Sequence, residues 1–157
     1  MAATALSIWN RLGGSSVGRW LFAKVICRKA PYFSSIKPRF LRFGPGACEV
    51  SLKKRRAVLN HLGTVHAIAV CNLAELGGGL AVDAALPETH RWIPKGMTVV
   101  YIKPATTDLT AIALCTLPEE LPDSGDQVVT VDVRDTSNTV VFRAIITMHV
   151  TRRVTKN

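Results

Sequence analysis

The sequence predicts an α+β domain in which an antiparallel sheet is folded over one long central helix. Residues 62–86 form a single apolar segment, rich in alanine and leucine, that is long enough for a buried helix. Residues 97–152 contain several runs of β-branched residues joined by short connections, which favours antiparallel pairing. Because a helix that is apolar nearly all round needs cover on every side, we expect the sheet to wrap around it.

Two short amphipathic helices are predicted within residues 1–30, ahead of a single globular domain over residues 31–157. Gly13-Gly14 separates the two helices, and Pro31 ends the second. With 157 residues and 48% apolar side chains, the chain has enough material for one substantial core. The residues at helical spacing are Leu6, Trp9 and Leu12 in the first helix and Val17, Leu21, Val25 and Ile26 in the second.

The strands are predicted from turn signals and from alternation. Gly44-Pro45-Gly46 is a turn between two short extended runs, 38–43 and 47–53. The last strand alternates between two faces, one of them apolar, and follows a hairpin turn at 135–138. The four strands expected after the central helix are 97–103, 109–117, 128–134 and 140–152.

Positive charge is concentrated at the N-terminus. The chain has 20 Lys and Arg against 11 Asp and Glu, and residues 1–48 hold eight of the bases and none of the acids. Such a segment is typical either of a mitochondrial presequence or of basic surface helices that could contact an anionic membrane surface. Nucleic-acid binding is not expected, because few aromatic residues are interleaved with the bases.

Several other classes of protein are excluded. The longest apolar stretch, 65–82, contains Asn72 and Glu75, whereas a bilayer-spanning helix needs about 20 nearly uncharged residues. The four cysteines are scattered without a Cys-x-x-Cys pair, which favours a reducing compartment: the cytoplasm or, in a eukaryote, the mitochondrial matrix. The four histidines lack the spacing of metal ligands, so no metal site is expected.

Glu75 is the only formally charged side chain between residues 60 and 79. Its neighbours are apolar, so we do not expect it on an ordinary solvated face, and a buried carboxylate must be hydrogen-bonded, paired or neutralised. It is therefore a candidate general base or nucleophile with a raised pKa. The alternative is a structural glutamate that accepts hydrogen bonds from a neighbouring chain or from the strands.

The start of the same helix offers backbone N–H groups near residues 64–67, where they could stabilise a carbonyl oxygen that becomes negative. Asn60, just upstream, could cap the helix or orient a water molecule. His66 and Glu75 are nine residues apart, about two and a half turns, so they point to opposite sides of one helix. Two antiparallel helices from two chains would bring the start of one near Glu75 of the other, and Gly77-Gly78-Gly79 would permit their close approach.

These residues carry a resemblance to a known family. Asn60, Gly63-Thr64-Val65-His66 and then Glu75 are spaced as in the active-site helix of hotdog-fold acyl-CoA thioesterases, most closely the phenylacetyl-CoA-type (PaaI-like) branch. Residues 101–105, Tyr-Ile-Lys-Pro-Ala, resemble the strand end that follows in that family. The resemblance covers residues 31–152, and the opening helices are similar to those of a poorly characterised bacterial subgroup.

The resemblance implies a homodimer, or a dimer of dimers, with acyl-CoA sites between two central helices and no cofactor other than the CoA thioester substrate. Glu75 would activate water or attack the thioester, and the N–H of Ala67 would bind the carbonyl oxygen. Asn60 would position the water or the thioester, and His66 would support the loop. The candidates for contact with the CoA phosphates are Lys103, Arg91 and Lys95.

Two functional hypotheses follow. The first is hydrolysis of a CoA thioester to a free acid and CoA, with Glu75 as base or nucleophile. The second is a hotdog protein that binds acyl-CoA without hydrolysing it. The second is suggested by Ala67-Ile68, which stand where the family usually has two glycines that let the thioester approach the backbone closely.

Overall fold

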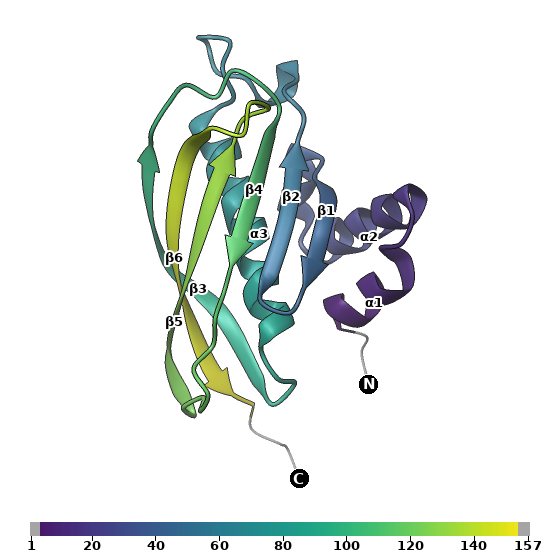
Figure 1. Cartoon of the computed structure of the whole chain (residues 1–157), viewed down its shortest axis with the longest axis vertical. Coiled ribbons are helices and arrows are strands. Elements are labelled where there is room, and N and C mark those ends of the chain that lie inside the picture. Colours follow the sequence, from purple (N-terminus) through teal and green to yellow (C-terminus); the bar gives the residue numbers. More distant parts are fainter. Residues whose placement is uncertain (1–3, 154–157) are drawn as a thin grey trace.

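One six-stranded antiparallel sheet folds over a long helix, α3 (Ala67–Ala85), in the computed structural model, which describes residues 4–153 (Figure 1). The predicted α+β hotdog fold is confirmed. The strand order is β1-β2-β4-β5-β6-β3, so β1 and β3 are the two edges. The remaining elements are α1 (Ala5–Leu12), α2 (Ser16–Lys29), the 3-10 helices η1 (Pro31–Ile36) and η2 (Arg56–Val58), β1 (Arg39–Gly44), β2 (Ala47–Leu52), β3 (His90–Tyr101), β4 (Leu109–Leu114), β5 (Ser124–Arg134) and β6 (Val140–Arg152).

The core lies between α3 and the sheet. Leu73 and Ala81 of α3 are fully buried against strand residues such as Val50 and Val131. A methyl group on Gly78 would come within 2.9 Å of Ile146, so the glycines of α3 bring the helix close to its own sheet. The prediction that Gly77-Gly78-Gly79 permit approach of a second helix is therefore wrong. Gly77 also faces the sheet, and Gly79 lies under Trp92.

Several predicted boundaries differ from the structure. Strand β4 ends at Leu114 rather than 117 and β5 begins at Ser124 rather than 128, and two further shifts are larger. The central helix begins at Ala67 rather than near residue 62, because residues 60–64 close a hydrogen-bonded loop before it. Strand β3 begins at His90, seven residues earlier than predicted, and it accommodates Pro94 through a register shift between Pro94 and Gly96. Proline is tolerated there because β3 is an edge strand.

The N-terminal helices add to the same core as the sheet. Phe22 is fully buried, and its ring lies 4.9 Å from Phe40 and 5.1 Å from Trp9, measured between ring centroids. The predicted apolar stripe of α2 does not form its buried face, apart from Ile26. Val17, Leu21 and Val25 are exposed. The buried residues are Gly18, Phe22, Ala23 and Ile26. The large Phe22 ring fills the aromatic cluster, and this choice sets the rotation of the helix.

By length and composition alone, α3 could span a membrane. About two thirds of it is buried in the structure. It is the core helix of the domain, covered by the sheet and flanked by η1 and α1.

Candidate functional site

Helix α3 begins with an unused hydrogen-bond donor. Its N-cap is His66, whose ring Nδ1 accepts a hydrogen bond from the backbone N–H of Ile68 at 3.1 Å. The backbone N–H of His66 donates to the carbonyl of Val58. Among residues 4–153, the N–H of Ala67 has no acceptor. Because it lies at the positive end of a 19-residue helix, it is placed to bind an oxyanion.

Asn60 holds the loop before α3. Its Oδ1 accepts from the N–H groups of Leu62 and Thr64 at 3.0 and 3.1 Å, and its Nδ2 donates to Oγ1 of Thr64 at 2.8 Å. It does not cap the helix, so that alternative is wrong, and His66 takes the role instead. One proton of the Asn60 amide remains free to meet a ligand.

A cavity of about 280 Å³ opens at this end of α3. Asn60, Thr64 and Ala67 line one side of it, and Tyr101, Lys103 and Phe142 line the other. The strand end that carries Lys103 is fixed because the N–H groups of Ile102 and Lys103 both donate to the carbonyl of Val141. The structure thus places the predicted residues Asn60, Ala67 and Lys103 around one cavity.

Glu75 lies beside a different cavity. It is half-buried and lines a space of about 360 Å³ on the side of α3 that faces the N-terminal helices. Among the described residues, its carboxylate has no ion-pair partner. No strand among the described residues donates a hydrogen bond to Glu75, so the alternative in which the strands of the same chain hold it is not supported. The apolar side chains around it include Ile26, Ala30, Phe33, Leu76, Leu80 and Trp92.

Ala67, Cys71 and Glu75 form one stripe along α3. Residues four apart on a helix are displaced by roughly 40° around the axis, so the three span about 80° and about 12 Å. Sγ of Cys71 lies 3.4 Å from Oη of Tyr101, which ties the middle of the stripe to the end of edge strand β3. This hydrogen bond, with some burial, raises the pKa of Tyr101 to about 12. Within one chain the Ala67 N–H and the Glu75 carboxylate stay at separate cavities.

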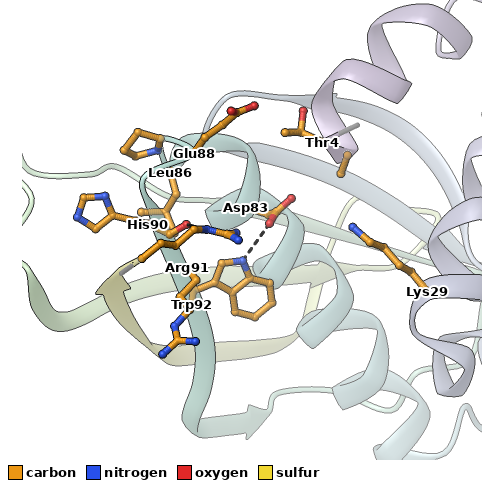
Figure 2. A pocket seen from close by; sticks show the side chains of 11 residues that line it. Thr4, Lys29, Asp83, Leu86, Glu88, His90, Arg91 and Trp92 are labelled. Carbon is orange, nitrogen blue, oxygen red and sulfur yellow. Dashed lines mark hydrogen bonds between the residues drawn. The ribbon is translucent and has the colours of Figure 1, made fainter. Parts of the chain in front are cut away.

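A cavity of about 530 Å³, the largest of the four described, shares lining residues with the Glu75 cavity. Figure 2 shows the side chains that line it. Asp83 accepts a hydrogen bond from Nε1 of Trp92 at 3.2 Å, and both residues line the two cavities together with Lys29. Arg91 lies here, at the start of β3, whereas Lys103 follows the end of the same strand. At about 3.3 Å per residue, the two side chains lie far apart in one chain and cannot meet the same phosphate there.

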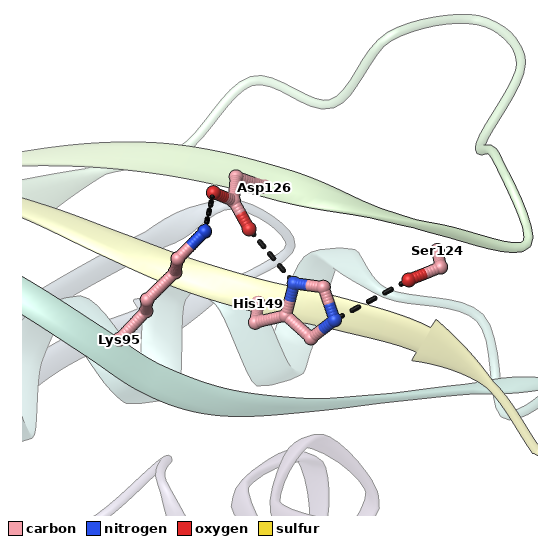
Figure 3. A network of polar contacts seen from close by, with 4 residues as sticks. All are labelled: Lys95, Ser124, Asp126 and His149. Atoms are coloured by element: carbon pink, nitrogen blue, oxygen red, sulfur yellow. Dashed lines mark hydrogen bonds and ion pairs between the residues drawn. The ribbon is translucent and has the colours of Figure 1, made fainter.

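Lys95 is engaged in a surface network (Figure 3). Its Nζ donates to Asp126, whose other oxygen lies 2.7 Å from Nδ1 of His149, and Nε2 of that ring lies 3.3 Å from Oγ of Ser124. Lys95 and His149 lower the pKa of Asp126. The serine, histidine and aspartate have the connectivity of a hydrolytic triad, but none of them lines any of the four cavities described.

Sequence reasoning missed three residues that shape these sites. Trp92 covers Gly79, Tyr101 joins Cys71 to β3, and Asn72 is buried with its Nδ2 donating to Oγ of Ser35 at 3.1 Å. Of the three, only Asn72 could have been found from the sequence, because an asparagine within an apolar helix is expected to need a hydrogen-bond partner. Within residues 4–153, no group of three or more His, Cys, Asp or Glu side chains is placed to hold a metal ion.

Comparison with solved structures supports the fold. The structural-genomics protein APC5556 is 43% identical, with a TM-score of 0.83 over 95% of this chain and 98% of that one. A thioesterase from Haemophilus influenzae is 22% identical, with a TM-score of 0.70 over 82% and 87% of the two chains. A thioesterase-family protein from Silicibacter pomeroyi is 16% identical, with a TM-score of 0.71 over 83% and 96%.

The sequence comparisons identify the family. No curated protein matches the chain. Residues 18–150, from α2 to β6, match the domain of unknown function DUF4442. The matched segment includes every residue that lines the Ala67 cavity and the Glu75 cavity except Ala5. The chain therefore belongs to the DUF4442 family, and it shares its hotdog fold with the solved thioesterase structures.

Proposed function

We propose that this protein is an acyl-CoA thioesterase whose active site is shared between two chains. The observation that carries the proposal is the separation of two complementary groups on α3. Within residues 4–153, the half-buried carboxylate of Glu75 has no ion-pair partner, and the backbone N–H of Ala67, eight residues away, has no acceptor. The thioesterase names of the solved hotdog structures support the same reaction.

An antiparallel arrangement of two α3 helices unites the two groups. If a two-fold axis passes near Cys71, Glu75 of one chain lies opposite Ala67 of the partner subunit, since both are four residues from the axis. The contact between Cys71 and Tyr101 means that the same stripe lies beside edge strand β3. We therefore propose a homodimer across this seam, or a dimer of such dimers.

Strand β3 supports this arrangement. It pairs only with β6 among the described strands, so its other edge has backbone groups available for a second chain. Ile93, Met97 and Val100 expose apolar surface along it, and Tyr101 does the same at its end. Exposed apolar surface of this kind marks an interface.

The chemistry follows from these positions. Glu75 accepts a proton from a water molecule, whose oxygen forms a bond to the thioester carbonyl carbon. The partner subunit's Ala67 donates its N–H to the carbonyl oxygen as charge develops there. The C–S bond then breaks, and the CoA thiolate takes the proton back from Glu75. His66 caps the helix that carries the donor, and Asn60 holds the preceding loop and can orient the water or the thioester.

The two cavities suggest where the substrate lies. The apolar space beside Glu75, enclosed by α2, η1 and Trp92, suits the acyl group. Lys103 at the Ala67 cavity and Arg91 at the largest cavity are available for the CoA phosphates, whereas Lys95 already pairs with Asp126. The four cysteines are free thiols, which supports a reducing compartment such as the cytoplasm.

The test is hydrolysis of a panel of short, medium, long and aryl acyl-CoA thioesters, followed with a thiol-reactive dye. We expect Glu75→Gln to lower kcat by about 10²–10⁴-fold, the contribution typical of a general base, while the oligomeric state is unchanged. Glu119→Gln, which removes an exposed carboxylate that lines none of the four cavities described, is the matched control and should retain activity. Absence of turnover by the unaltered protein on every thioester would refute the proposal.

Ile68 supports the second candidate function, acyl-CoA binding without hydrolysis. Its side chain is exposed next to Ala67, where a glycine would leave the amide open to a thioester. Calorimetry that shows acyl-CoA binding without thiol release would select this function, and absence of CoA binding would eliminate both.

A further inference from the structure

Helix α2 has two apolar faces, and one of them is not covered by any part of the chain that the structure describes. Its inner face packs Phe22 and Ile26 into the core. The outer face, defined here as Val17, Trp20, Leu21, Lys24, Val25 and Arg28, leaves its apolar side chains in solvent. Val17 is 66% and Trp20 58% exposed, and Leu21 and Val25 are 41% and 38% exposed.

Positive charge lies on the same outer face. Lys24 and Arg28 stand between the apolar side chains, and Nζ of Lys24 lies 5.4 Å from the centre of the Trp20 ring. Arg11 and Lys29 are exposed at the ends of the two helices. The first 48 residues contain no acidic side chain, so the face has no internal negative charge to balance these bases.

We propose that the outer face of α2 docks the protein on an anionic lipid bilayer. A tryptophan, short aliphatic side chains and flexible bases on one helical face suit the membrane interface: the apolar groups enter the acyl boundary, and the bases reach the lipid phosphates. Buried Phe22 already holds the helix folded, so docking requires no further ordering of the backbone. A second copy is a poorer occupant, because it would bring the same positive charges face to face.

The position of α2 permits docking. The helix lies on the β1 side of the sheet, away from β3, which is the opposite edge (Figure 1). A protein docked through α2 therefore keeps its β3 edge free for a second chain. The inference is independent of the proposed hydrolysis, since Glu75 and Ala67 take no part in it.

The experiment measures co-sedimentation of the full chain with vesicles of pure phosphatidylcholine and of phosphatidylcholine mixed equally with phosphatidylglycerol. We expect binding only to the anionic vesicles, weakened by salt. Trp20 emission should shift to the blue on binding, and Trp20→Phe should remove the shift. The paired change Lys24→Glu with Arg28→Glu should weaken binding by at least about tenfold, because each base near an anionic surface contributes several-fold.

The control pair, Lys53→Glu with Lys54→Glu, makes the same change in net charge at exposed lysines away from α2 and should bind as the unaltered protein does. The proposal would be overturned if the protein does not bind anionic vesicles at low salt. It would also be overturned if the control pair loses as much vesicle binding as the paired change at Lys24 and Arg28. A different outcome would also overturn the proposal. If the protein does not bind vesicles but forms a larger oligomer, and the paired change Leu21→Ser with Val25→Ser dissociates that oligomer, the outer face of α2 binds a second copy of the chain instead.

Discussion

The two edges of the sheet differ in what covers them. Strand β1 is short, carries Arg39 and Arg42 on its exposed side, and packs Phe40 and Phe43 against α2. Strand β3 is twice as long and exposes apolar side chains. Unpaired edges invite association, and proteins protect them with charge, short length or covering elements. The N-terminal helices pack on β1, whereas one edge of β3 is unpaired among the described strands, and there we propose that a second chain binds.

The largest effect is expected where α2 meets β1. Phe22→Ala removes a fully buried ring from the aromatic cluster and should lower the free energy of unfolding by about 3–5 kcal/mol. Urea denaturation followed by circular dichroism measures it. Trp20→Ala, on the exposed face of the same helix, should change stability by no more than about 0.5 kcal/mol. Equal losses would mean that α2 does not cover β1 as described.

A smaller effect is expected at the β3 edge. Met97→Glu places a charge in the proposed seam and should raise the dimer dissociation constant at least tenfold, about 1.4 kcal/mol, with the fold retained. Analytical ultracentrifugation measures the constant, and thioesterase activity should fall with dimer content. Val128→Glu, at an exposed position on the interior strand β5, is the matched control and should leave the dimer intact. The proposed dimer contact through β3 would be contradicted if Val128→Glu dissociates the dimer as well, or if the unaltered protein is a monomer.

The smallest effect concerns how β3 is held to the rest of the sheet. Lys95 and His149 lower the pKa of Asp126 in the folded protein. A depressed carboxyl pKa stabilises the fold above the unfolded value of about 3.9, and that contribution is lost as the pH falls through the folded pKa. Asp126→Asn should therefore lower the melting temperature slightly at pH 7, and the difference should shrink and then disappear as the pH falls through the lowered pKa of Asp126 in the folded protein. A difference that grows in acid would contradict this contact.

Local patterns predicted the layers of the fold but not which faces meet. Strand β6 spans the residues that its alternation indicated, and the apolar segment became α3. The rotation of α2 could not be predicted, because Leu21 and Phe22 are both apolar and only the shape of the aromatic cluster chooses between them. The start of β3 was missed because Pro94 reads as a strand breaker, although an edge strand tolerates it.

The candidate site was predicted in composition and only partly in geometry. The spacing of Asn60, His66 and Glu75 indicated the helix and its loop. The helix is capped by His66 and not by Asn60, because the Asn60 side chain accepts hydrogen bonds within its own loop. The contact between Cys71 and Tyr101 joins residues 30 apart in sequence, and no local pattern encodes such a pair.

The central claim is that Glu75 of one chain acts with the Ala67 N–H of another. Ala67→Pro removes that N–H with little cost to the helix, because proline suits the first helical position and His66 before it is already extended. Alone, Ala67→Pro and Glu75→Gln should each be inactive. Each mixed dimer, however, would contain one intact shared site.

Co-expression of the two variants with different affinity tags, followed by the acyl-CoA assay on the unsorted mixture, is the most direct measurement. Random pairing makes half of the dimers mixed, with one of two sites intact in each, so activity should return to about a quarter of that of the unaltered protein. Activity that stays at the level of the single variants would contradict a site shared between chains.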